Sequence, residues 1–446
     1  MSASSRSALL LPLVSLLAIA CRTGAPPARV AAREEPVQAR PEPAPGADDA
    51  GRLYLRAWMQ SRRGDADGAL ETLRALDARG WDIPLDGRDF PGLAEREEFR
   101  AIAARIAARA PATAHAAVAI RLPERGLVAE GIAVDPRDGT LYVGSIRLRK
   151  IVRVAPGGTA TDVVPAAAGG LGRVLGLKVD SRRGLLWAAA NHGDAPDGGA
   201  RAGSRSGVYA FDLASGAPRR AATIDGAGHL LNDLAIADDG AVIVTDSEAG
   251  AVYRLDPDAA ALAPVVPAGT FAYANGIAFA EGRLLVADAF GLWDVPVAGG
   301  APRRLAGPAG FPLGGIDGLS AVGRTLVAVQ NGLGTPRIVR LELAPGAERV
   351  VRAEVLEAGN PDWHTPTTGA LDRGVFHYIG NSHVDGWKEA ELDPAGMVET
   401  RIHRLEITIH AGAQPHHSSR PEAADRARGF RLTSGPARGA VGASTG

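Results

Sequence analysis

The most constraining feature of the sequence is a unit that occurs six times between about residues 118 and 407. Each copy begins with an anchor residue, usually followed by glycine and then by an apolar residue. The anchors lie 42 residues (Asn275 to Asp317) to 57 residues (Leu175 to Asn232) apart. Periods of this length occur in β-propellers and in helical solenoids, so the content of the repeat decides between these folds. The six anchor tripeptides are Glu130-Gly131-Ile132, Leu175-Gly176-Leu177, Asn232-Asp233-Leu234, Asn275-Gly276-Ile277, Asp317-Gly318-Leu319 and Thr368-Gly369-Ala370.

Glycines and apolar runs within each copy favour β-strands joined by tight turns. A second glycine follows every anchor by six to nine residues, and an apolar run such as Leu141-Tyr142-Val143 comes next. This pattern is typical of hairpins, and the high totals of Gly (56) and Pro (31) agree with many turns. We predict an all-β, six-bladed β-propeller with four strands in each blade. The segment Val118–Leu122 is expected to supply the outer strand of the last blade and so close the ring. The six turn glycines are Gly139, Gly184, Gly240, Gly282, Gly323 and Gly374.

The anchors predict a metal site on the propeller axis. The first strand of each blade lines the central tunnel, so equivalent positions form a ring. Four anchors carry oxygen donors with two negative charges between them, namely Glu130, Asn232, Asn275 and Asp317. This set suits Ca²⁺, whereas Zn²⁺ favours His or Cys and Mg²⁺ demands stricter octahedral geometry. Two alternatives stay open: a polar tunnel without metal, and Asn275-Gly276 and Asp317-Gly318 as simple turns.

The anchor motifs that contain Glu130, Asn232, Asn275 and Asp317, in this order, resemble the senescence marker protein-30/gluconolactonase/LRE-like family, with its relatives the paraoxonases and diisopropylfluorophosphatase. The resemblance covers the propeller, and it implies a six-bladed fold with a catalytic Ca²⁺ on the axis and hydrolysis of lactones or related esters. By this resemblance, Glu130, Asn275 and Asp317 match the metal ligands of the family. Asn232 matches a residue that contacts substrate or metal, depending on the branch of the family.

A hydrolase of this kind needs a general base that takes a proton from water. The first candidate is Asp317, a carboxylate beside the expected metal, and Glu130 is the second, although each could be a ligand alone. His229, at the expected mouth of the tunnel, and His192 and His364, on long loops, are alternatives, although a single loop histidine is more often a surface residue.

The sequence departs from the sugar-lactone members of the family at one position. Those members place an arginine two residues before the asparagine that matches Asn232, whereas this chain has Leu230. An apolar tunnel mouth suits a less polar lactone or ester, or no substrate. Two functions therefore compete: a calcium-dependent hydrolase, and a non-catalytic calcium-binding propeller that acts as a scaffold or binding protein.

The N-terminus is typical of an exported lipoprotein. Arg6 precedes an apolar run from Ala8 to Ala20, which is too short to span a membrane. Cys21 is the only cysteine, and the preceding residues resemble a bacterial lipoprotein box in which Ala18 stands where Leu is usual. We therefore expect residues 1–21 to be a signal peptide that ends in lipidation at Cys21, with residues 22–48 as a disordered tether. Lipidation would anchor the protein at the bacterial cell envelope, either in the periplasm or at the cell surface. The alternative is an ordinary cleaved signal peptide without lipidation.

A helical segment and a polar tail flank the expected propeller (residues 115–407). Apolar residues at helical spacing over residues 49–110 predict a helix-turn-helix unit of tetratricopeptide type and a third helix. Such a unit must bury its apolar face against the propeller, another copy or a protein partner. Residues 408–446 contain few apolar residues and are expected to be disordered. The net charge of -1 gives no overall field to attract nucleic acid, which is therefore not an expected partner. The family resemblance implies a small-molecule lactone or ester as the partner, and the membrane is expected to be reached only through the lipid anchor.

Overall fold

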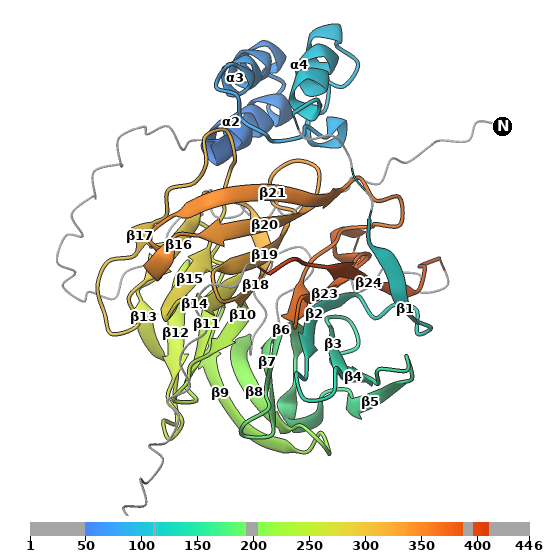
Figure 1. The fold of residues 1–446 in the computed structure, drawn as a ribbon, viewed down its shortest axis with the longest axis vertical. Coiled ribbons are helices and arrows are strands. Elements are labelled where there is room, and N and C mark those ends of the chain that lie inside the picture. Colours follow the sequence, from blue (N-terminus) through green and yellow to red (C-terminus); the bar gives the residue numbers. More distant parts are fainter. Residues whose placement is uncertain (1–49, 110–112, 114, 193–203, 387–395, 410–446) are drawn as a thin grey trace, which may run out of the picture. The chain divides into compact units, whose positions relative to one another are not determined.

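The computed structural model describes residues 50–109, 113, 115–192, 204–386 and 396–409, all within the first of two compact units, Met1–His410. In these ranges it contains six four-stranded antiparallel sheets and three α-helices (Figure 1). The predicted six-bladed β-propeller with an N-terminal helical segment is therefore confirmed. The predicted signal peptide, Cys21, the tether and nearly all of the predicted tail lie outside the described residues.

The blades follow one another along the chain, and within each the strand order runs outward from the first strand. The first three are β2 (Ala129–Val134), β3 (Leu141–Ser145), β4 (Ile151–Val154), β5 (Ala160–Val164); β6 (Arg173–Asp180), β7 (Leu185–His192), β8 (Arg205–Asp212), β9 (Pro218–Asp225); and β10 (Leu231–Ile236), β11 (Val242–Asp246), β12 (Ala251–Leu255), β13 (Ala263–Val266). The next two are β14 (Ile277–Ala280), β15 (Arg283–Ala287), β16 (Leu292–Val295), β17 (Arg303–Arg304); and β18 (Ile316–Val322), β19 (Thr325–Gln330), β20 (Arg337–Leu343), β21 (Val350–Ala358).

The last blade combines strands from both ends of the propeller. It consists of β22 (Gly369–Asp372), β23 (Val375–Ile379), β24 (Thr400–Glu406) and, as its outer strand, β1 (Ala117–Leu122). The pairing is antiparallel, with Val118 opposite His403 and Ile120 opposite Ile402, across a register irregularity. The predicted closing strand is thus present. It covers the edge of β24 that would otherwise expose unpaired backbone groups.

The two sets of glycines have different physical roles. The six predicted turn glycines all have positive φ, from 58° at Gly323 to 92° at Gly240, a region that residues with a Cβ rarely adopt. Four of the five anchor glycines, all except Gly369, instead permit close approach of neighbouring inner strands; a Cβ on Gly318, for example, would lie 2.7 Å from the Cα of Thr368. Gly318 is inside β18, and Gly276 directly precedes β14. The alternative that these two dipeptides are simple hairpin turns is therefore wrong.

The helical segment has its own apolar core and packs on the propeller. It consists of α2 (Ala50–Arg62), α3 (Ala66–Ala78) and α4 (Glu97–Ala107), and its core includes Leu333 of the propeller. Backbone bonds join the two parts, with the Asp82 N–H donating to Gly310 O at 2.8 Å and the Thr335 N–H donating to Pro84 O at 2.9 Å. The apolar face of the segment is therefore buried within this chain. Its similarity to a tetratricopeptide unit stays a prediction.

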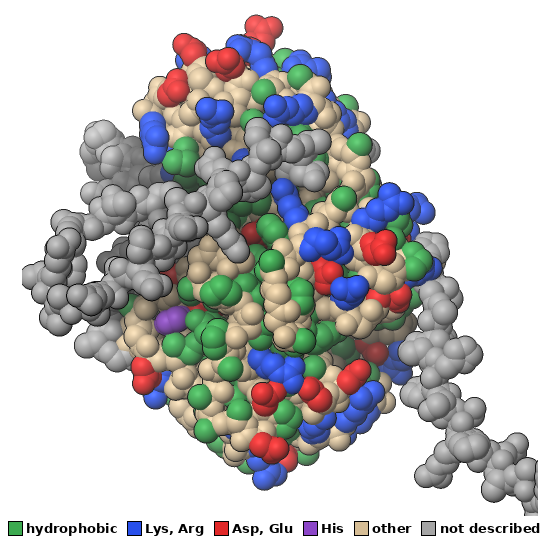
Figure 2. All heavy atoms as spheres, turned by 90° about the vertical axis from the view of Figure 1, so that its left-hand side faces the viewer, with side chains coloured by type: hydrophobic (Ala, Val, Ile, Leu, Met, Phe, Trp, Pro, Cys, Tyr) green, Lys and Arg blue, Asp and Glu red, His purple; other side chains and the backbone are tan. Residues whose placement is uncertain are grey.

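The described residues contain no helix suited to cross a membrane, and neither sign of charge dominates the surface in the view of Figure 2. Among the described residues, no helix is long and apolar enough to cross a bilayer. In Figure 2 acidic and basic side chains alternate over the helical segment and the blades. This mixture agrees with the near-zero net charge and offers no extended basic face in that view.

Candidate functional site

The structure buries all four oxygen-bearing anchors at the inner strands. Glu130 lies on β2, Asn232 on β10 and Asp317 on β18, while Asn275 directly precedes β14. Each of these side chains is at most 4% exposed. Thr368, the sixth anchor, donates through its Oγ1 to the backbone O of Glu130 and so connects the last blade to the first. The inner strands thus place the predicted residues on one ring.

Asp317 is the centre of a hydrogen-bonded cluster within this ring. Its Oδ1 accepts from Asn275 Nδ2 at 2.7 Å, and its Oδ2 accepts from Asn331 Nδ2 at 2.6 Å. Asn331 follows the second strand of its blade, β19, and its Nδ2 also contacts Pro366 O at 2.9 Å. Asn331 was not among the predicted site residues. Its only signal in the sequence is the polar Gln330-Asn331-Gly332 stretch at the end of a buried strand.

Buried carboxylates repel one another in the ring. Burial, followed by the nearby charges of Asp317 and Asp233, raises the pKa of Glu130 well above its usual value. Burial also raises the pKa of Asp317 to about 7, and Asp233 and Asp385 add to this effect while the two amide donors oppose it. Lys178 Nζ lies 3.6 Å from Asp233 Oδ1, so Asp233 has a cationic partner at the edge of the ring. Glu130 and Asp317 are therefore the carboxylates that most need positive charge.

Three buried oxygens of this cluster have no hydrogen-bond partner: Glu130 Oε2, Asn275 Oδ1 and Asn331 Oδ1. An unsatisfied buried polar atom costs on the order of 1–3 kcal/mol, so three close to one carboxylate require an explanation. All three are hard acceptors, and a bound cation with a preference for oxygen would satisfy them. Among the described residues, no group of three or more His, Cys, Asp and Glu side chains could hold a metal ion. The oxygen set described here combines two carboxylates with amides instead.

Asn232 belongs to a separate hydrogen-bonded chain. Its Nδ2 donates to Ser247 Oγ at 2.9 Å, and this hydroxyl donates to Ala274 O at 2.6 Å. The chain fixes the Asn232 amide relative to the residue that precedes Asn275. Asn232 is thus held in the ring, although it does not hydrogen-bond directly to Asp317.

A histidine–aspartate pair lies next to Asn232 in the sequence. His229 Nδ1 is 2.6 Å from Oδ2 of the fully buried Asp246, whose Oδ1 accepts from the Leu230 N–H at 2.9 Å. The His229 side chain is 22% exposed, so it can reach solvent while Asp246 orients its ring. The Leu230 side chain is half-buried at the same edge. Of the three predicted histidines, His229 is therefore the one that has a carboxylate hydrogen-bond partner among the described residues.

The other two histidines contact groups other than the ring anchors. His192 Nε2 is 2.7 Å from Gly170 O, and burial lowers the pKa of His192. His364 stacks on His383 with ring centroids 4.5 Å apart. Burial and the adjacent His364 lower the pKa of His383 to about 4. Neither His192 nor His364 has a hydrogen bond to a ring anchor in the part of the chain described.

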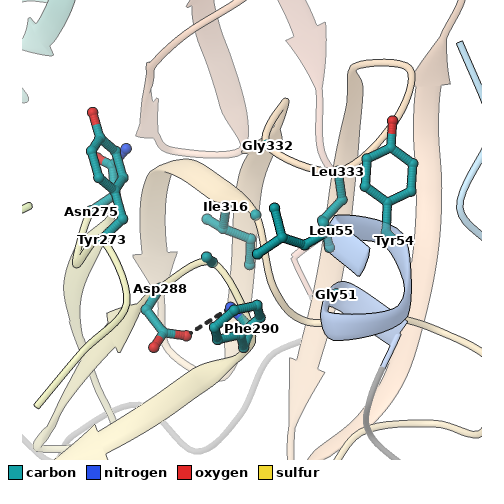
Figure 3. A pocket seen from close by; sticks show the side chains of 12 residues that line it. Gly51, Tyr54, Leu55, Tyr273, Asn275, Asp288, Phe290, Ile316, Gly332 and Leu333 are labelled. Carbon is teal, nitrogen blue, oxygen red and sulfur yellow. Dashed lines mark hydrogen bonds between the residues drawn. The ribbon is translucent and has the colours of Figure 1, made fainter. Parts of the chain in front are cut away.

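A pocket lies between helix α2 and the ring (Figure 3). It is partly open, and its empty space together with the adjoining open solvent amounts to about 450 Å³. In Figure 3, Tyr273 and Asn275 lie on the side opposite α2, and Leu55 extends from α2 toward Ile316. Tyr273 adopts φ 62°, which is uncommon for a residue with a bulky side chain. The lining residues are Gly51, Tyr54, Leu55, Tyr273, Asn275, Asp288, Ala289, Phe290, Gly315, Ile316, Gly332 and Leu333.

Fold and site together define the class: a six-bladed β-propeller with a buried oxygen-rich cluster on its axis. Residues 128–289 match the family described as SMP-30/Gluconolactonase/LRE-like region. The resemblance predicted from the anchor motifs is therefore confirmed. The matched stretch contains Glu130, Asn232 and Asn275, and Asp317 lies beyond its end.

Several solved structures are similar to this chain. A PQQ-bound aldose sugar dehydrogenase from Streptomyces coelicolor is 19% identical, covering 66% of this chain and 99% of that one with a TM-score of 0.44. A gluconolactonase from Xanthomonas campestris is 20% identical, covering 67% and 94% with a TM-score of 0.43. Virginiamycin B lyase from Staphylococcus aureus is 14% identical, covering 65% and 98% with a TM-score of 0.41. A comparison with curated protein sequences gives no match. The assignment of the fold rests on the strand pairing of this chain itself.

Proposed function

We propose that this protein is a calcium-dependent hydrolase of lactones or related esters. The observation that carries the proposal is the set of three unpartnered buried oxygens beside Asp317, in a ring whose carboxylates repel one another. Ca²⁺ accepts six to eight oxygen ligands in flexible geometry, which suits carboxylates mixed with amides. The family match over residues 128–289 supports a lactonase-type activity independently of the cluster.

The metal ligands in this proposal are Glu130, Asp317, Asn275 and Asn331, with Asn232 contacting metal or substrate. The unpartnered oxygens of Glu130, Asn275 and Asn331 would each gain a partner. A calcium ion at this position would polarise the substrate carbonyl and favour negative charge on its oxygen.

Asp317 is proposed as the general base. It accepts a proton from the attacking water while the water oxygen forms a bond to the carbonyl carbon. The proton then passes to the leaving alkoxide as the acyl–oxygen bond breaks, which gives a hydroxy acid from a lactone. The Asn275 and Asn331 amides hold both carboxylate oxygens of Asp317 in position. His229, oriented by Asp246, is the second candidate for the base, and Glu130 the third.

The proposal is tested with the full chain on a panel of γ-lactones and aryl esters, before and after treatment with a calcium chelator. We expect turnover of at least one substrate, its loss on chelation, and its recovery when Ca²⁺ is restored. Turnover that chelation leaves unchanged would contradict the calcium dependence. Ca²⁺ that raises the melting temperature while no substrate is hydrolysed would favour the alternative, a non-catalytic calcium-binding scaffold.

Anchoring at the bacterial cell envelope through Cys21 is a separate proposal, supported by the apolar run and lipoprotein-type box in the sequence. A Cys21→Ala variant should move from the membrane fraction to the soluble exported fraction, and the wild-type protein should take up a labelled fatty acid. Equal fractionation of both proteins would contradict lipidation at this residue.

A further inference from the structure

The pocket described above has one wall from the helical segment and one from the propeller. Gly51, Tyr54 and Leu55 of α2 form the first wall, whereas Phe290 and Ile316 belong to the second. These side chains are apolar apart from the Tyr54 hydroxyl, which donates to Asp89 within the helical segment. Figure 3 shows the Tyr54 ring directed away from Asn275. The middle of the pocket is therefore a surface for an apolar group.

The end of the pocket opposite α2 is polar and belongs to the ring. Asn275 lines it, is 2% exposed and carries one of the unpartnered oxygens, Oδ1. Its Nδ2 donates a hydrogen bond to Oδ1 of Asp317, the candidate base. A molecule that places a carbonyl group near Asn275 would therefore extend its remaining atoms toward Leu55.

Close packing and an ion pair hold the helical segment, including α2, against the propeller. A Cβ on Gly51 would lie 3.1 Å from both Ala289 O and Phe290 Cδ1, so the helix backbone approaches this loop closely. Nearby, the fully buried Arg337 donates through Nη1 to Asp82 Oδ2 at 2.9 Å and through Nε to Gln330 Oε1 at 2.7 Å. The approach at Gly51 and the Arg337–Asp82 ion pair cross between the helical segment and the propeller, whereas Gln330 orients Arg337 from within the propeller. They make the wall a fixed part of the pocket.

We infer that this pocket binds the alkyl chain of the substrate, so that α2 selects for lactones or esters with a short apolar substituent. The inference rests on the proposed function and names its substrate class. A second apolar residue agrees with it, since the half-buried Leu230 lies two residues before Asn232 in the sequence. The helical segment then acts in substrate selection within this chain, and its apolar faces need no protein partner.

Substitutions at Leu55 test the inference in the full-length protein. The substrates are γ-butyrolactone, γ-hexalactone and γ-octalactone, which share the ring and differ in the alkyl chain. Leu55→Phe should narrow the pocket and lower kcat/KM for γ-octalactone about tenfold more than for γ-butyrolactone, in line with the discrimination that one or two methylenes give in an apolar site. Leu55→Ala should shift the preference toward γ-octalactone.

Leu53→Phe is the matched control, because Leu53 is half-buried on the same helix and does not line the pocket. It should leave the ratio of kcat/KM values unchanged, and melting temperatures of all variants should be measured to identify damage to the fold. Equal effects of Leu55→Phe on all chain lengths, or the same change of ratio in Leu53→Phe, would overturn the inference.

The proposed function and the pocket can fail separately. If the wild-type protein hydrolyses no lactone, the proposed function fails, and titration calorimetry with the same lactones decides on the pocket. Tighter binding of γ-octalactone than of γ-butyrolactone, weakened by Leu55→Phe and kept in Leu53→Phe, would support the pocket without catalysis. Equal affinity for both lactones would overturn it.

Discussion

The axial ring and the helical segment both bury acidic groups, but they satisfy them differently. Burial raises the pKa of Asp89 in the helical segment to about 6 and that of Asp317 in the ring to about 7. Asp89 accepts a hydrogen bond from the buried Tyr54 hydroxyl. Asp317 also accepts hydrogen bonds, from Asn275 and Asn331, but it lies among other carboxylates, and oxygens beside it lack partners. A raised pKa alone therefore does not identify a functional site, and the ring is singled out by the combination of neighbouring carboxylates with unpartnered oxygens.

The largest expected effect separates the two aspartates by activity. Asp317→Asn removes the candidate base and should lower kcat by about 10²–10⁴-fold, the usual contribution of a general base. Asp89→Asn should leave kcat within about twofold, because Asp89 lies in the helical segment, outside the ring and the pocket lining. Steady-state kinetics at saturating Ca²⁺ checks both. Calcium affinity should be measured alongside, because equal losses of turnover and calcium binding in Asp317→Asn would make Asp317 only a ligand.

The next effect concerns the pH dependence of stability in the helical segment. The pKa of Asp89 is raised when the chain is folded, so its contribution to stability is fully present below pH 4 and is lost as pH rises through about 6. The loss amounts to at most about 3 kcal/mol. Denaturant unfolding at pH 4.5 and 7.5 should show that the wild type loses more stability than Asp89→Asn over this range. A difference between the two proteins that does not change with pH would contradict this account.

The smallest expected effect tests the unpartnered oxygens. At a Ca²⁺ concentration 100 times Kd, binding should stabilise the wild type by about 2.7 kcal/mol. Asn331→Ala removes one proposed ligand and one donor to Asp317, so it should reduce this stabilisation and raise Kd at least about tenfold. Thermal unfolding with and without Ca²⁺ measures the change. Asn360→Ala, at a buried amide bonded to Glu357 instead, is the control and should keep the full calcium response.

The ring could be predicted because repetition makes it visible in the sequence. Glu130, Asn232, Asn275 and Asp317 occupy the same position in four of the six copies, and the propeller brings such positions together. The close contact between neighbouring inner strands also explains why glycine usually follows the anchor. Asp233 replaces that glycine in one blade, and its charge raises the pKa values of Glu130 and Asp317. The repeat alone did not indicate this role.

The remaining parts of the site depend on contacts without a repeated signal. Asn331 reaches Asp317 from the end of a second strand, and its position has no equivalent among the anchors. The pocket depends on how closely α2 approaches the loop at Phe290, which the small size of Gly51 permits. Helical periodicity predicts that α2 exists and which face is apolar, but not which part of the propeller that face meets.

The closing strand also has a consequence for the order of events during synthesis. Val118 pairs with His403, 285 positions further along the chain, so β1 leaves the ribosome long before its partner exists. At the usual rate of translation, the delay is on the order of 15 to 60 s. Throughout this interval the β1 segment has no partner strand, and folding of the residues next to it in the sequence cannot supply one. The last blade, and with it the contact between Thr368 and Glu130, can form only after almost the whole propeller has been made.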